Sequence, residues 1–135
     1  MLFRSNNNLV QAARGIIALG PRTLVVKHGE YGATLFHSSN SKGGKAELRT
    51  FKAPALPLQE VIDPTGAGDS FAGGFFGFLA SQPELTPASW RHAMFYGGVM
   101  GSYACERFGT ERLQRLSRAE IDERFNLFRE ITHLD

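Results

Sequence analysis

The sequence predicts a single α/β domain in which one helix precedes four strands and three helices follow them. Apolar residues recur at helical spacing near the N-terminus and again through the C-terminal half. The segment between these regions is rich in β-branched residues and is interrupted by glycine and proline, a pattern typical of strands and turns. At 135 residues with 42% hydrophobic content, the chain is large enough for one buried core.

The first half of the chain is predicted to contain the first helix and the four strands. The helix spans 9–17, where apolar residues recur at helical spacing before a glycine-proline pair. The strands are expected at 23–28, 33–37, 46–51 and 59–62. The tight turn Gly29–Gly32 joins the first two into a hairpin, and the polar segment 38–45 is expected to be a surface loop.

The second half is predicted to be helical. One helix begins at Asp69, with four apolar residues on one face and glycines at 73, 74 and 77 that permit close approach of a neighbour. A second helix has Thr86-Pro87 as its N-cap and first residue, and Gly109 follows its end. Ser117 and Glu120 have capping-box spacing and predict the start of a third helix, which runs to the C-terminus.

Composition and charge argue against several classes of protein. The net charge of +2 comes from 15 basic and 13 acidic residues without a long run of one sign, so nucleic-acid binding is not expected. The same charge pattern does not suggest binding at a membrane surface, and the apolar stretches are too short to span a bilayer. Cys105 is the only cysteine, which favours a reducing, cytoplasmic location and a core thiol rather than a nucleophile. The four histidines lack metal-ligand spacing.

The segment Asp63–Phe71 carries the residues best suited to chemistry. Its sequence, DPTGAGDSF, joins a predicted strand to a predicted helix, and its glycines leave backbone N–H groups uncovered at the helix N-terminus. Such N–H groups and the positive end of the helix dipole stabilise phosphate charge. The carboxylate of Asp69 is placed to accept a hydrogen bond from an incoming hydroxyl and to orient it for in-line attack. This combination predicts a site of phosphoryl transfer.

Other interpretations of the glycine-rich turn are weaker. Aspartate often caps a helix and Gly-x-Gly often makes a turn without any ligand, but the string as a unit favours a functional site. A dinucleotide-binding fingerprint would need glycine where Phe71 stands, and no Walker A lysine follows. Lys27, at the end of a predicted strand, leaves two interpretations open: a contact with nucleotide phosphates or a solvated side chain.

Three stretches together resemble the ribokinase-like (PfkB-type) carbohydrate kinases. The stretch 63–75 resembles the C-terminal signature of that family, 27–33 its nucleotide-contacting strand and turn, and 104–109 its cation loop. The resemblance covers nearly the whole chain. It implies the C-terminal part of a three-layer α/β/α fold with helices packed on a sheet. It also implies transfer of the γ-phosphoryl group of ATP to a hydroxyl, with magnesium as a cofactor.

The resemblance further implies roles for individual residues. Asp69 corresponds to the catalytic base, and the anion hole at the transferred phosphate to the amides of Gly66, Ala67 and Gly68. The nucleotide pocket would be lined by the stretch around Gly97 and by Lys27, His28, Gly29, Glu30 and Gly32. A site for a monovalent cation such as potassium would use the Asp63 side chain and the carbonyls of Thr65, Ala104, Arg107 and Gly109. Leu113 stands where many members offer a hydroxyl ligand.

The resemblance leaves the acceptor and the assembly open. Family members are substantially longer, with the acceptor-binding face and lid in their N-terminal half, so we expect a fragment. The family's Asn-x-x-Glu segment, which helps organise magnesium, is not matched by Asn6–Asn8. The acceptor is a sugar or, alternatively, a nucleoside; a catalytically silent nucleotide-binding or assembly module is a further alternative. An exposed sheet edge and apolar helix faces would favour a homo-oligomer, with 23–37 or 9–17 near the contact.

Overall fold

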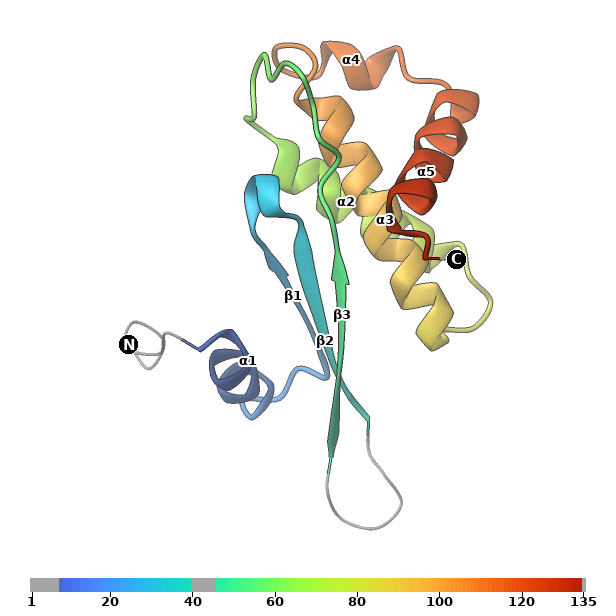
Figure 1. The fold of residues 1–135 in the computed structure, drawn as a ribbon. Helices are drawn as coiled ribbons and strands as arrows, with labels where there is room; N and C mark the ends of the chain where they lie inside the picture. The colour runs from blue at the N-terminus through green and yellow to red at the C-terminus, as the bar shows by residue number, and fades with distance from the viewer. Residues whose placement is uncertain (1–7, 40–45, 135) are drawn as a thin grey trace. The chain divides into compact units, whose positions relative to one another are not determined.

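The computed structural model describes residues 8–39 and 46–134 (Figure 1). These residues form two compact units: one comprises 8–26 together with the described part of 34–52, and the other comprises 27–33 and 53–134. Most of the Asn6–Asn8 run and most of the loop predicted at 38–45 lie outside the described residues. No helix among the described residues combines the length and apolar character needed to cross a bilayer.

The first unit contains helix α1 (Leu9–Ile17) and most of a three-stranded antiparallel sheet. Asn8 caps α1, its side-chain oxygen accepting from the backbone N–H groups of Val10 and Gln11. The strands β1 (Thr23–Lys27), β2 (Ala33–Ser39) and β3 (Glu47–Ala53) are ordered β1-β2-β3, so β2 is central. Its first four residues, 33–36, are all buried, as expected for a strand covered on both faces.

The β1-β2 hairpin matches its prediction. The Ser38 N–H donates to the Arg22 carbonyl at 2.8 Å. Near the turn, the His28 N–H donates to the Gly32 carbonyl at 2.7 Å. This register places Thr23 opposite His37, and their side chains share a hydrogen bond of 2.8 Å between Oγ1 and Nδ1. The turn itself is a short 3-10 helix, Gly29–Tyr31.

The prediction of a fourth strand at 59–62 is wrong. Residues 54–66 form neither helix nor strand, because Pro54 and Pro57 cannot donate ladder hydrogen bonds. The N–H groups of Ile62 and Asp63 instead donate to the Cys105 carbonyl, at 2.9 and 3.3 Å. The segment before the glycine turn is therefore anchored to the end of a helix and not to a sheet.

The second unit is mainly helical. Its helices are α2 (Ala67–Ala80), α3 (Pro87–Ala104), α4 (Glu111–Gln114) and α5 (Arg118–Thr132). The capping boxes predicted from Thr86 and Ser117 are present at the starts of α3 and α5. The one-turn helix α4 was not predicted, and α3 ends at Ala104, several residues before Gly109. The α/β class is confirmed, with three strands instead of four.

Helices α2 and α3 pack closely at a few glycines. A Cβ at Gly74 would lie 2.5 Å from the Tyr96 carbonyl oxygen and 2.7 Å from Met100 Cγ. A Cβ at Gly73 or Gly77 would meet nothing within 4 Å. Of the three glycines expected to permit close approach, only Gly74 does so, because the other two are exposed on the helix.

Helix α3 also packs against α5, and the two share a hydrophobic core (Figure 1). Its buried members are Val99, Tyr103, Phe125 and Phe128. Beside this core, the Glu106 carboxylate forms ion pairs with both Arg112 and Arg124. Arg112 also binds Glu120, with 2.6 Å between Nη2 and Oε1. These four charged residues, which we call the Arg-Glu network, tie the end of α3 to α4 and α5.

Acid is expected to weaken this network through Glu120. Hydrogen bonds from the Ser117 backbone, the Arg112 guanidinium and the Ser117 hydroxyl lower the pKa of Glu120 from 4.5 to about 2. A depressed pKa contributes stability that is fully present above pH 4.5 and is lost as the pH falls through about 2. As the pH is lowered from 6 to 2, the free energy of unfolding in urea should therefore fall less for Glu120→Gln than for the wild type. An exposed control, Glu123→Gln, should behave like the wild type.

Candidate functional site

The predicted anion site lies at the start of α2, in the second unit. Gly66 has φ +81°, a left-handed conformation that favours glycine and lets the chain turn sharply into the helix. The Ala67 N–H donates to the Pro64 carbonyl at 3.2 Å, and the Ser70 N–H donates to the Gly66 carbonyl at 2.9 Å. Among the described residues, no acceptor is seen for the N–H groups of Gly66, Gly68 or Asp69.

This geometry changes the predicted set of anion-binding amides. Of the three that the sequence indicates, those of Gly66 and Gly68 are available, but that of Ala67 is used within the turn. The Asp69 amide, in the first turn of the helix, is available in its place. Asp69 itself is exposed, so its carboxylate is accessible to a substrate at the same helix N-terminus.

Lys27 brings a positive charge to this helix terminus. Its Nζ donates to the Gly68 carbonyl at 3.1 Å, although the two residues are 41 positions apart in the sequence. Lys27 is exposed, but the hydrogen bond places its ammonium group at the first turn of α2. The ammonium group is therefore bound to α2, and a contact with nucleotide phosphates stays a prediction.

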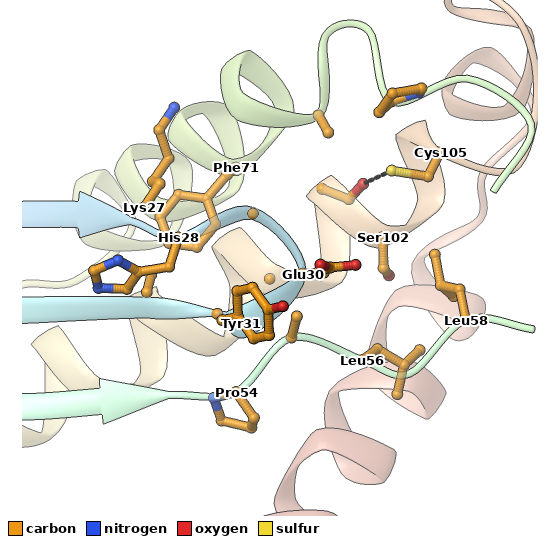
Figure 2. Close-up of a pocket in the computed structure, with 18 of the residues that line it drawn as sticks. Lys27, His28, Glu30, Tyr31, Pro54, Leu56, Leu58, Phe71, Ser102 and Cys105 are labelled. Atoms are coloured by element: carbon orange, nitrogen blue, oxygen red, sulfur yellow. Dashed lines mark hydrogen bonds between the residues drawn. The ribbon is translucent and has the colours of Figure 1, made fainter.

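A cavity of about 770 Å³ adjoins the anion site within the second unit (Figure 2). Its wall includes five residues that were predicted to line a nucleotide pocket: Lys27, His28, Gly29, Glu30 and Gly32. The remaining wall is mostly apolar and includes Leu56, Leu58, Val61 and Phe71. Its volume falls within the range of small-molecule pockets, and an apolar wall with a few polar groups is typical of such pockets.

Gly97 is not part of the cavity wall. It is buried, and a Cβ there would lie 3.0 Å from the ring of Phe71, so this position serves packing between α2 and α3. The residues that follow it supply the wall: Gly98, Gly101 and Ser102 of α3, and Cys105 at the C-cap of that helix. Gly98 belongs to the stretch around Gly97 that the sequence indicates, whereas Gly101, Ser102 and Cys105 were not predicted to line a pocket, although their spacing places all four on one helix face.

Cys105 lines the cavity without the features of a nucleophile. Burial, followed by the negative charges of Asp63 and Glu106, raises the pKa of its thiol above the usual value of 9.0. The thiol donates to the Gly101 carbonyl at 3.4 Å (Figure 2). A protonated, hydrogen-bonded thiol is a poor nucleophile, which agrees with the structural role expected for it.

The predicted cation site is partly assembled. Hydrogen bonds from the backbone and hydroxyl of Thr65, and from the Gly109 backbone, lower the pKa of Asp63. Asp63, Thr65 and Gly109 therefore lie together. Ala104 ends α3, and Arg107 follows it in the exposed segment that leads to Gly109. Carboxylate and carbonyl oxygens are suitable ligands for a hard cation.

Most of the chain matches the model of a known protein family. The model of the pfkB family of carbohydrate kinases matches residues 2–115. The chain is also similar to an adenosine kinase from Schizophyllum commune, with 38% identity over 65 residues. That alignment covers 48% of this chain and 18% of the adenosine kinase.

Two solved structures share the fold. One is a nucleoside kinase from Burkholderia thailandensis in complex with inosine, with TM-score 0.62 and 32% identity over 82% of this chain and 32% of that one. The other is a fructokinase from Vibrio cholerae O395 bound to fructose, ADP and calcium, with TM-score 0.70. Its 20% identity, over 89% of this chain and 36% of that one, shows the fold alone. The likeness confirms the ribokinase-like α/β fold, and the chain spans only about a third of either structure.

Proposed function

This chain belongs to the pfkB family of carbohydrate kinases, and we propose that it forms the nucleotide-binding and catalytic part of an ATP-dependent kinase. The reaction is transfer of the γ-phosphoryl group of ATP to a hydroxyl of a small molecule. One observation carries the proposal: the Lys27 ammonium lies 3.1 Å from the Gly68 carbonyl, at a helix N-terminus that opens beside a cavity of about 770 Å³.

The described residues support a division of roles. The available amides of Gly66, Gly68 and Asp69 donate to the phosphate oxygens, and Lys27 adds a positive charge beside them. The apolar cavity wall accommodates the base. The Asp69 carboxylate accepts the proton of the acceptor hydroxyl and orients its oxygen for in-line attack on the γ-phosphorus.

The cofactors implied by the family fit this donor set. Magnesium is usually held by substrate phosphates with one or two carboxylates. With ATP bound at the start of α2, the exposed Asp69 carboxylate would be the group of this site nearest in kind to a magnesium ligand. Magnesium would neutralise charge on the phosphates. A monovalent cation such as potassium would be held by the Asp63 carboxylate and nearby carbonyl oxygens, and would stabilise the turn that precedes α2.

A nucleoside is favoured over a sugar as the acceptor. Over the aligned residues, which cover 48%, 82% and 89% of this chain, the adenosine kinase is 38% identical, the nucleoside kinase 32% and the fructokinase 20%. Phosphoryl transfer to a panel of nucleosides and sugars tests this preference. Phosphorylation of adenosine or inosine but not of fructose is expected, and the reverse would contradict it. ATP binding without transfer to any acceptor would favour the catalytically silent module.

Replacing Lys27 tests its role in phosphate binding. Lys27→Met should weaken ATP binding by roughly 10- to 100-fold, because one charge-assisted hydrogen bond to the phosphates is lost. Isothermal titration calorimetry measures the change. Lys52→Met, which removes an exposed lysine elsewhere in the chain, should leave the ATP affinity unchanged. Equal affinities for the wild type and Lys27→Met would show that Lys27 does not contact the phosphates of ATP.

A further inference from the structure

Ser102 is a buried hydroxyl on the cavity wall, and its hydrogen bonds limit what it can offer to a ligand. Ser102 is 8% exposed and lies on the α3 side of the cavity, whereas Lys27 lies on the β1 side (Figure 2). Its hydroxyl donates to the Val99 carbonyl at 2.7 Å and accepts from Arg124 Nη1 at 3.2 Å. A hydroxyl has one proton and two lone pairs, so Ser102 retains one acceptor position and no donor.

Arg124 is held in place by the Arg-Glu network. Its guanidinium forms an ion pair with Glu106, and its Cζ lies 3.5 Å from the centroid of the Tyr103 ring. Arg112 binds the same Glu106 and also lies over Tyr103, but it does not contact Ser102. Within the network, Arg124 therefore makes the hydrogen bond that orients the Ser102 hydroxyl, whereas the hydrogen bonds of Arg112 go to Glu106 and Glu120.

We propose that Ser102 selects the nucleotide base by accepting a hydrogen bond from an exocyclic amino group, as adenine carries. This inference rests on the proposed function, because it takes the cavity as the ATP site. The charged Lys27 suits the phosphate end of the cavity, and the apolar side chains of Leu56 and Leu58, on the same side of the cavity as Ser102, suit the base (Figure 2). A base with a carbonyl oxygen at the same position would face an acceptor lone pair of Ser102 and find no donor there, which is costly in a buried site.

ATP and inosine triphosphate provide the direct test, because they differ at that exocyclic position: an amino group in ATP and a carbonyl oxygen in inosine triphosphate. Calorimetry with the full 135-residue chain should show about tenfold tighter binding of ATP. In Ser102→Ala the ratio of the two affinities should fall close to one. Most of this change should come from weaker ATP binding, since alanine offers no acceptor.

The two arginines supply a matched pair of variants. Arg124→Met keeps an apolar stem over Tyr103 but frees the Ser102 hydroxyl to rotate and donate, so the ratio should fall. Arg112→Met removes a comparable ion pair with Glu106 without touching Ser102, so the ratio should stay at the wild-type value. Thermal unfolding of both variants separates loss of stability from loss of selectivity.

The possible outcomes separate this inference from the proposed function. A wild-type chain that binds neither nucleotide contradicts the proposed function and the inference with it. A wild-type chain that binds both equally overturns base selection by Ser102 but leaves the kinase proposal standing. If Ser102→Ala keeps the wild-type ratio of the two affinities, base selection by Ser102 is overturned as well. If Ser102→Ala does not fold, Arg124→Met takes its place: an unchanged ratio of the ATP and inosine triphosphate affinities in that variant also overturns base selection by Ser102.

Discussion

Replacing Asp69 by asparagine is expected to lower kcat by roughly 100- to 10,000-fold, the usual contribution of a general base. The amide keeps the size of the side chain but cannot take the proton from the acceptor hydroxyl. Affinity for ATP should change by no more than about twofold, because the base acts on the acceptor and not on the nucleotide. Asp69 is exposed, so the substitution should not disturb packing.

The measurement is kcat for phosphoryl transfer, made on the active enzyme, whether that is the 135-residue chain or a longer polypeptide that contains it. Calorimetry gives the ATP affinity of the same variant. Glu123→Gln, an exposed neutral replacement on α5, is the control and should retain the wild-type kcat. A wild-type kcat in Asp69→Asn would reject Asp69 as the base.

Adding a methyl group at Gly74 is expected to destabilise the chain by about 1–3 kcal/mol. The new Cβ would lie 2.5 Å from the carbonyl oxygen of Tyr96, which is backbone and cannot rotate away. Helices α2 and α3 must therefore separate locally, which weakens the packing around Phe71 and Gly97. Urea unfolding of Gly74→Ala measures the free energy, and a lower melting temperature should accompany it.

Two neighbouring glycines on α2 provide the controls. Gly73→Ala and Gly77→Ala add the same methyl group where nothing lies within 4 Å. Both should stabilise the chain by up to about 1 kcal/mol, because alanine is the better helix former. If Gly74→Ala were as stable as these two variants, the close approach of α2 and α3 would not exist in solution.

Much of the fold was predictable because its signals are local. Turn residues marked the β1-β2 hairpin, and capping boxes at Thr86 and Ser117 marked the starts of α3 and α5. The strand predicted at 59–62 failed because a short apolar run has no fixed structure of its own. Prolines precede this segment, and the N–H groups at its end donate to the Cys105 carbonyl. The segment therefore holds the glycine turn against the end of α3.

The sequence by itself determined which groups lie together at the start of α2. The left-handed glycine, the available amides and the Asp69 carboxylate belong to one short stretch, whose local backbone geometry brings them together. Only the tertiary structure decided which distant groups join them. Lys27 reaches Gly68 across 41 positions, Gly98 and Ser102 replace Gly97 on the cavity wall, and Arg124 orients the Ser102 hydroxyl. These contacts depend on how the hairpin turn and helices α2, α3 and α5 pack, because no local pattern relates residues so far apart in the chain.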